Sequence, residues 1–142
     1  MRGLLAGLRV GYAVAAAELI GDLDSVRDSY PVDRCAIAGA VAAIQDEAHH
    51  ERIVETVRRE RARLHDALTE LGWDVLPSQA NFVFARPPAP HSATEVAARL
   101  RGARILVRHF DAPGIDARLR ITIGDSPATD RLLTALAELA AG

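Results

Sequence analysis

The sequence predicts an α+β (mixed α/β) fold in which a small, mainly antiparallel sheet packs against helices. Apolar residues recur at helical spacing in the first half of the chain, and short runs rich in β-branched and aromatic residues follow Gly72. The chain has 142 residues, of which 49% are hydrophobic and 25% are charged. This composition suffices for a domain with a core and excludes a disordered or fibrous protein.

The first segments are expected to be one strand and two helices. Leu8 to Ala17 is almost continuously apolar, which is typical of a short strand buried on both faces. Glu18 to Tyr30 carries one apolar stripe and predicts a helix that Pro31 ends. The Ala-rich run from Cys35 to Ile44 predicts a second, more buried helix.

The clearest helix is expected over Glu51 to Leu71, where Gly72 supplies the stop signal. Two later helices have recognisable starts. Ser92 stands three residues before Glu95, which is the spacing of a capping box, and predicts a helix to about Arg101. Ser126 precedes a proline and is expected to cap the last helix.

Four short strands are expected, over Trp73 to Leu76, Asn81 to Phe84, Ile105 to Val107 and Leu119 to Ile123. In the last strand, alternation places Arg120 on the face away from the core.

The charged residues are balanced, with 17 basic against 19 acidic side chains and a formal net charge of −2. No bulk positive field therefore indicates a nucleic acid or an acidic membrane as partner. Every basic residue is arginine and none is lysine, so the chain cannot form a lysine Schiff base by itself. With one cysteine, Cys35, no signal-peptide pattern and no apolar run long enough for a membrane span, a cytoplasmic protein is expected.

No metal site is expected. His49 and His50 are adjacent and point in different directions on a helix, and no third ligand is evident nearby. The arginines between Arg58 and Arg63 are interleaved with acidic residues, which favours a salt-bridged helix face over an RNA contact.

Four segments in order resemble the C-terminal part of the histidinol-phosphate aminotransferases: Leu5 to Tyr12, Pro77 to Phe82, Ile105 to Arg108 and Leu119 to Gly124. The resemblance covers essentially the whole chain. It implies a pyridoxal-phosphate enzyme of fold type I, in which a large domain carries most of the cofactor site. Residues 1–17 would then be a remnant strand of that large domain, and residues 18–142 the small C-terminal domain.

The resemblance also implies roles for three arginines. Arg9 would contact the cofactor phosphate, Arg120 would clamp the anionic end of the substrate, and Arg108 would be a second arginine near the substrate phosphate. The lysine of the family falls on Met1, so this chain has no catalytic residue of its own. Because arginine stays protonated and cannot replace that amine, the chain alone is expected not to transaminate or to hold pyridoxal phosphate covalently.

Two other hypotheses about function stay open. The domain could be a stand-alone protein that binds phosphate ligands or cleaves RNA like a toxin, using Arg108 and His109. It could also be a non-catalytic interaction module, because severing a large domain exposes apolar surface. The expected partners are an anionic small molecule and either a lysine-bearing large-domain polypeptide or a second copy. Histidinol phosphate, aromatic amino acids and threonine phosphate all remain candidate substrates.

Overall fold

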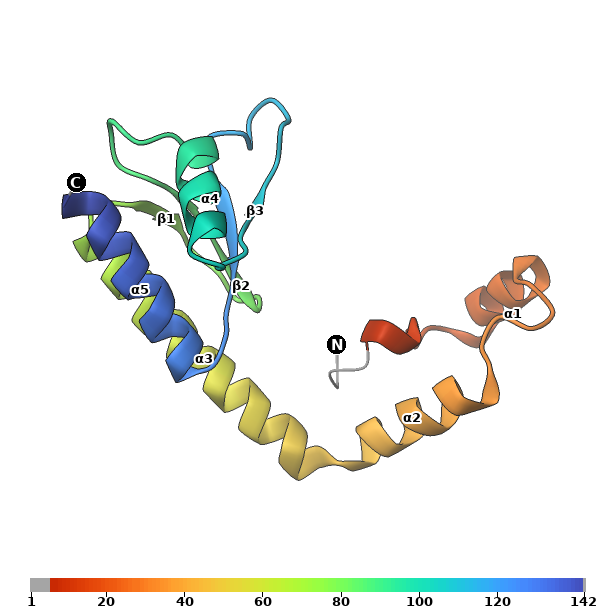
Figure 1. The fold of residues 1–142 in the computed structure, drawn as a ribbon. Helices are drawn as coiled ribbons and strands as arrows, with labels where there is room; N and C mark the ends of the chain where they lie inside the picture. The colour runs from red at the N-terminus through yellow and green to blue at the C-terminus, as the bar shows by residue number, and fades with distance from the viewer. Residues whose placement is uncertain (1–5, 142) are drawn as a thin grey trace. The chain divides into compact units, whose positions relative to one another are not determined.

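The computed structural model describes residues 6–141 (Figure 1). Met1, on which the lysine of the resembled family is expected to fall, lies outside the described residues. The chain forms two compact units, the first ending at Ile53 and the second beginning at Val54.

The first unit contains a short 3-10 turn, η1 (Ala6–Leu8), followed by helices α1 (Ala17–Val26) and α2 (Arg34–Gln45). The strand predicted over Leu8 to Ala17 is wrong. Its backbone beyond η1 is irregular, and Val14 is 89% exposed. A strand buried on both faces needs neighbouring strands, and none of the strands among residues 6–141 pairs with this segment.

The two helices follow the predicted order, and the second is the more buried of the two. In α1 the helix ends at Val26, because Arg27 takes an extended conformation with ψ 154°. The helix α2 has the predicted extent, and the Asp33 carboxylate caps it by accepting a 2.9 Å hydrogen bond from the backbone N–H of Ala36. Ala36 is the only buried residue described in α2, and α1 has none, so α2 is the more buried helix, as expected, although most of its residues are exposed.

Helix α3 (Glu47–Glu70) confirms the clearest prediction and begins one turn earlier than expected. The extension has a cause in the sequence, since the Asp46 carboxylate accepts a 3.1 Å hydrogen bond from the backbone N–H of His49. The helix ends before Gly72, whose φ of 81° lies in the left-handed region that favours glycine.

The sheet contains β1 (Asp74–Leu76), β2 (Phe82–Arg86), β3 (Arg108–His109) and β4 (Leu119–Thr122) in the order β1-β2-β4-β3, and all neighbours are antiparallel. This confirms the predicted fold class. The third strand is misplaced in the prediction, which put it at residues 105–107. Ile105 and Val107 pack against the core from irregular backbone. Their apolar pattern therefore indicates partial burial and not strand pairing.

Two further helices complete the second unit, α4 (Ala93–Gly102) and α5 (Ser126–Ala141). The predicted capping box at Ser92 is present in full. The predicted cap of α5 is wrong by one residue. The Asp125 carboxylate accepts from the backbone N–H of Ala128 at 3.0 Å, whereas the Ser126 hydroxyl turns to another helix.

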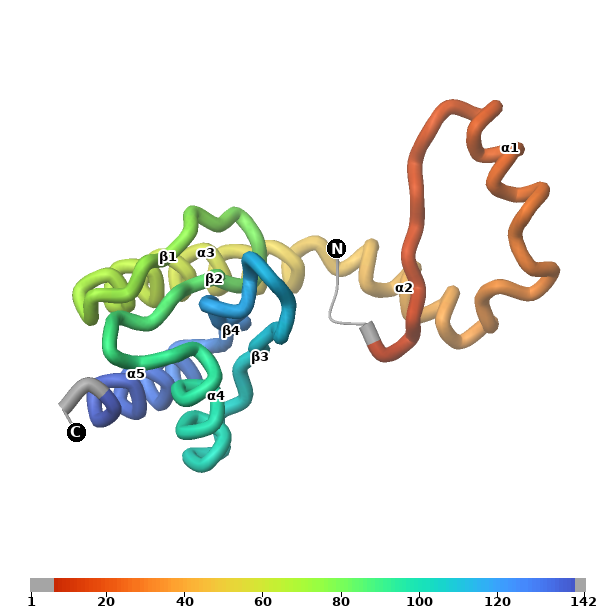
Figure 2. The backbone as a smooth tube through the Cα atoms, turned by 90° about the horizontal axis from the view of Figure 1, so that it is seen from above, coloured from red at the N-terminus to blue at the C-terminus, as the bar shows by residue number. Residues whose placement is uncertain are grey.

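All three helices of the second unit pack on one face of the sheet. Helix α5 runs alongside α3 (Figure 1), and α4 lies next to α5 (Figure 2). The shared core contains the inward residues of two strands and leucines from the helices: Leu64, Leu68, Val83, Ala85, Leu100, Leu119, Ile121, Leu132 and Leu136. The strand residues between them are half-buried or exposed and lie outside this core, so the opposite face of the sheet is not covered by a helix of this unit. Among residues 6–141, no helix has the length and apolar character of a membrane span.

Candidate anion-binding site

The uncovered face of the sheet carries arginines and aromatic rings. We call it the open face and define it by five residues: Phe82, Phe84, Arg108, Phe110 and Arg120. On β4, Leu119 and Ile121 are buried, whereas Arg120 between them is exposed, as the alternation predicts.

Arg108 and Arg120 are direct cross-strand partners, one on β3 and the other on β4. Side chains at such positions start about 5 Å apart, and like charges placed there repel each other. Within residues 6–141, neither guanidinium makes a hydrogen bond or an ion pair, and both side chains are exposed. Two positive charges therefore stand side by side with their N–H donors free.

Both guanidinium groups lie over aromatic rings. The Cζ atom of Arg120 lies 5.7 Å from the ring centroids of both Phe82 and Phe110, and the Cζ atom of Arg108 lies 5.2 Å from the centroid of Phe110. Phe84 meets Phe110 edge to face, with centroids 6.4 Å apart and an interplanar angle of 74°. The negative ring faces attract both cations.

The adjacent row of the sheet shows the opposite arrangement. There the Asp74 carboxylate binds the guanidinium of Arg86 at 3.1 Å and that of Arg118 at 2.7 Å. Arg118 also donates a 2.8 Å hydrogen bond to the backbone carbonyl of Asp74. One carboxylate binds both of these arginines, so donors of Arg86 and Arg118 are occupied within the fold, whereas those of Arg108 and Arg120 are available for a ligand.

Such a pair suits a doubly charged oxyanion. A guanidinium is always charged and presents its donors in a planar fork that matches carboxylate and phosphate oxygens.

The third predicted arginine is in the other unit. Arg9 is exposed and has a φ of 55°, and it lies in the first unit, whereas Arg108 and Arg120 lie in the second. Its contact with a cofactor phosphate stays a prediction.

The histidines do not form a metal centre. Within residues 6–141, no three His, Cys, Asp or Glu side chains are grouped so that they could hold a metal ion. His109, whose neighbour is Arg108, has its ring Nε2 2.7 Å from the backbone carbonyl oxygen of Asp116. This contact occupies one nitrogen of the histidine that RNA cleavage would need.

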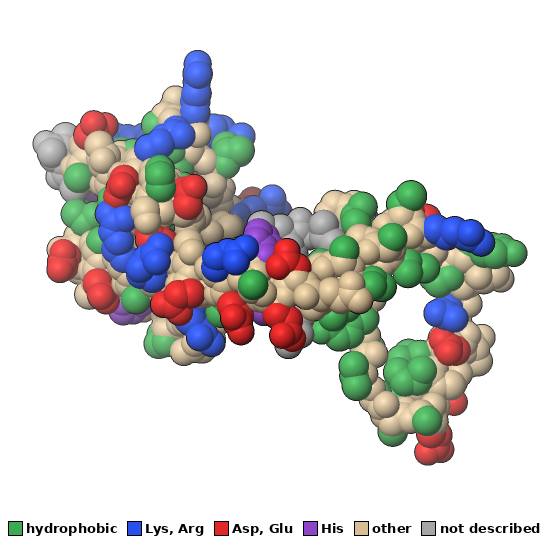
Figure 3. All heavy atoms as spheres, turned by 90° about the horizontal axis from the view of Figure 1, so that it is seen from below, with side chains coloured by type: hydrophobic (Ala, Val, Ile, Leu, Met, Phe, Trp, Pro, Cys, Tyr) green, Lys and Arg blue, Asp and Glu red, His purple; other side chains and the backbone are tan. Residues whose placement is uncertain are grey.

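The arginines of α3 are salt-bridged in part, as predicted. Arg59 and Arg63 pair with Glu60 at 3.3 and 3.4 Å, and Arg63 also pairs with Asp130 of α5. Arg61 donates a 2.8 Å hydrogen bond to the backbone carbonyl of Ala80. Through these contacts, Arg59, Arg61 and Arg63 bind groups of the protein itself. Charges of both signs are interleaved over the second unit in the view of Figure 3.

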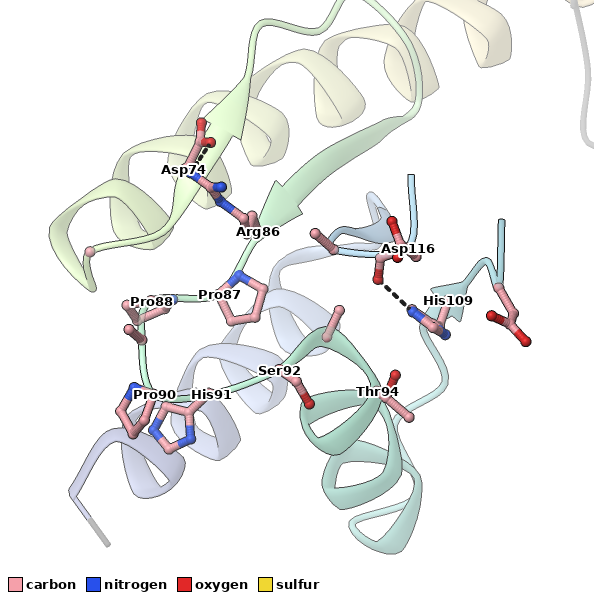
Figure 4. A pocket seen from close by; sticks show the side chains of 15 residues that line it. Asp74, Arg86, Pro87, Pro88, Pro90, His91, Ser92, Thr94, His109 and Asp116 are labelled. Atoms are coloured by element: carbon pink, nitrogen blue, oxygen red, sulfur yellow. Dashed lines mark hydrogen bonds and ion pairs between the residues drawn. The ribbon is translucent and has the colours of Figure 1, made fainter. Parts of the chain in front are cut away.

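A recess of about 660 Å³ lies beside the start of α4 (Figure 4). Several of its polar groups already have partners: Asp74 pairs with Arg86, His109 contacts the Asp116 carbonyl, and Ser92 is bound in its capping box. The recess is therefore a weaker candidate for a ligand site than the open face.

Reasoning from the sequence missed the three phenylalanines of the open face, which are all the phenylalanines of the chain. The sequence does contain a pattern that predicts their position. Phe82 and Phe84 alternate with the buried Val83 and Ala85, and Phe110 stands two residues after Arg108, so all three fall on the face of the arginines.

Comparisons with known proteins show the family of the chain. The sequence model of the family "Aminotransferase class I and II" matches residues 4–136. Histidinol-phosphate aminotransferase 2 of Thiobacillus denitrificans is 53% identical over 139 residues, which are 95% of this chain and 39% of that protein. The histidinol-phosphate aminotransferase of Aromatoleum aromaticum is 52% identical over 138 residues, again 95% of this chain and 38% of that protein. The chain thus spans about two fifths of the length of these relatives.

Solved structures give the same result for the fold. The histidinol-phosphate aminotransferase of Sinorhizobium meliloti, in complex with pyridoxal-5'-phosphate, superposes with a TM-score of 0.83 at 25% identity and covers 96% of this chain and 38% of that one. A putative histidinol-phosphate aminotransferase of Erwinia carotovora atroseptica superposes with a TM-score of 0.84 at 26% identity, with 95% and 38% covered. Since sequence and fold both match over nearly its whole length, the chain belongs to the class I and II aminotransferase family.

Proposed function

We propose that this chain is the anion-binding C-terminal portion of a histidinol-phosphate aminotransferase, and that its open face binds the phosphate of the substrate. The observation that carries the proposal is the pairing of Arg108 with Arg120, two directly opposed cations without an acidic partner among residues 6–141. A phosphate monoester would offset their repulsion and accept several N–H donors at once. The 53% identical relative, whose name specifies histidinol phosphate, supports this substrate class.

The chain does not by itself fit pyridoxal phosphate as a covalently held cofactor. The sequence contains no lysine, and of the three predicted arginines only Arg9 is assigned to the cofactor by the family resemblance. Pyridoxal phosphate supplies the amino-transfer chemistry in this family, and the amine that anchors it has to come from another polypeptide segment. We therefore propose that the chain does not transaminate alone and that Arg9 contributes to the cofactor phosphate site only in the assembled enzyme.

The first unit supports a second candidate function, binding of a protein partner. Its two helices expose large apolar side chains: Leu19, Leu23, Val26, Ile37, Val41 and Ile44. Apolar side chains are visible on the surface of this unit in Figure 3. A lysine-bearing large-domain polypeptide would cover these side chains and supply the missing amine in one step. Self-association of this chain would cover them without supplying it.

Two measurements test these proposals. Calorimetric titration with histidinol phosphate and with histidinol tests the anion site, and binding of histidinol phosphate alone is expected because only that ligand carries the phosphate. Light scattering over a range of protein concentrations tests the second candidate. A chain that stays monomeric at every concentration and does not bind an added large-domain polypeptide would overturn the second candidate function.

A further inference from the structure

Phe110 is the one residue of the open face whose ring contacts both arginines. Its centroid lies 5.2 Å from the Cζ atom of Arg108 and 5.7 Å from that of Arg120. Phe82 contacts Arg120 only, and Phe84 contacts the ring of Phe110 without a ring contact to either arginine. Phe110 is therefore placed to act on both cations together.

The kind of contact decides whether an arginine keeps its N–H donors for a ligand. An ion pair holds a guanidinium by occupying its N–H donors, as Asp74 does for Arg118. A ring face holds the cation through its π electrons and leaves the N–H donors for another acceptor. A ring that restrains two neighbouring arginines in this way reduces the side-chain entropy that a ligand would otherwise have to remove.

We propose that Phe110 is a positioning residue that keeps Arg108 and Arg120 together as a preformed clamp for a phosphate dianion. The inference rests on the proposed function for the ligand that the clamp takes, and it adds the residue that arranges the clamp. Phe110 itself touches neither phosphate nor cofactor in this account.

The variant that tests this role is Phe110→Leu, which keeps an apolar side chain and removes the ring. Phe110→Tyr restores a ring face and is the rescue variant. Tyr30→Leu is the matched control, because it removes a ring that is 96% exposed and lies outside the open face. Circular dichroism and thermal melting of the full chain identify any variant that fails to fold.

The first readout needs no ligand. In nuclear magnetic resonance spectra of the full chain, the Nε–Hε signals of Arg108 and Arg120 are expected to show ring-current shifts and restricted motion. Both are expected to be lost in Phe110→Leu and kept in Phe110→Tyr and Tyr30→Leu. Unchanged arginine signals in a folded Phe110→Leu would overturn the positioning role.

The second readout is titration with inorganic phosphate, with acetate as the singly charged comparison. Phe110→Leu is expected to raise the dissociation constant for phosphate by about five- to thirtyfold, the scale of two exposed cation–π contacts, while Tyr30→Leu stays within about twofold of the unaltered chain. Equal phosphate binding by Phe110→Leu and the unaltered chain contradicts the inference alone. An unaltered chain that binds no phosphate, with its arginine signals still dependent on Phe110, contradicts the proposed function and leaves the positioning role standing.

Discussion

The Ser126 hydroxyl donates a 2.6 Å hydrogen bond to the carboxylate of Glu60, and so joins the first turn of α5 to the middle of α3. Glu60 is 2% exposed and also accepts from Arg59 and Arg63. A carboxylate is tolerated at such a position only when it is paired and hydrogen-bonded. This contact explains why Ser126 does not cap its own helix.

The same contact predicts how stability depends on pH. The hydrogen bond from Ser126 holds the pKa of Glu60 below its ordinary value, against the opposing effect of burial, and Arg59, Thr129 and Arg63 add to the lowering. Since the pKa is lower in the folded chain, this stabilisation is complete above the unfolded pKa of about 4.3 and is lost as the pH falls through the folded value.

We therefore expect Ser126→Ala to be less stable than the unaltered chain at neutral pH and to lose less stability on acidification. Urea unfolding at about pH 7 and at about pH 3.5 measures both effects. Ser126→Thr keeps a hydroxyl and serves as the control. Identical losses of unfolding free energy in Ser126→Ala and the unaltered chain over this range would contradict the assignment.

The capping box of α4 predicts a separate loss of stability. The Ser92 hydroxyl accepts from the backbone N–H of Glu95, and the Glu95 carboxylate accepts from the backbone N–H of Ser92. Ser92→Ala removes the first of these bonds and is expected to lower the free energy of unfolding by about 1 kcal/mol. Ser92→Thr can still cap and is expected to lose less, and the reverse ranking in urea unfolding would argue against the cap.

Gly124 is required for packing between β4 and α5. A Cβ atom at this position would lie 2.7 Å from the Cβ of Ala128, closer than real Cβ contacts. Gly124→Ala is therefore expected to destabilise the chain by about 1–3 kcal/mol. Adding Ala128→Gly removes the clash, so the double variant should be more stable than the sum of the two single effects.

The control for this pair is Gly102→Ala, because a Cβ atom there would have nothing within 4 Å. It is expected to leave the free energy of unfolding unchanged or to raise it by up to about 1 kcal/mol, because alanine favours a helix more than glycine does. Additive effects of Gly124→Ala and Ala128→Gly in urea unfolding would refute the steric explanation.

The absence of lysine predicts the response of the chain to pyridoxal phosphate. Borohydride reduction after mixing is expected to leave no adduct on any side chain, because none carries a primary amine. Peptide mass mapping measures this directly. Transamination is expected only after a lysine-bearing large-domain polypeptide is added, and activity of the chain alone would contradict the proposed function.

The sequence was sufficient to predict the second unit in most respects. Helix α3, the capping box at Ser92 and the outward position of Arg120 follow from local signals that burial and hydrogen bonding reinforce. The third strand was misplaced because Ile105 and Val107 are partly buried against the core without being paired, and an apolar run does not distinguish these two states.

The remaining errors have one physical origin, contacts between segments distant in the sequence. The strand expected over Leu8 to Ala17 would need neighbours that the described part of the chain does not provide. The role of Ser126 depends on Glu60 in another helix, 66 residues earlier. Likewise, the resemblance named Arg108 and Arg120 separately, and only the register of β3 with β4 shows that they face each other.

The central claim is that Arg108 and Arg120 bind the phosphate of the substrate, and calorimetric titration of arginine variants tests it most directly. Arg108→Gln and Arg120→Gln are compared with Arg131→Gln, which removes an equal charge from an exposed position of α5. Each of the first two variants is expected to weaken binding of histidinol phosphate at least about tenfold, the scale of a lost charge-assisted hydrogen bond. Arg131→Gln should bind like the unaltered chain. Equal affinity for histidinol phosphate in all four proteins would contradict the account.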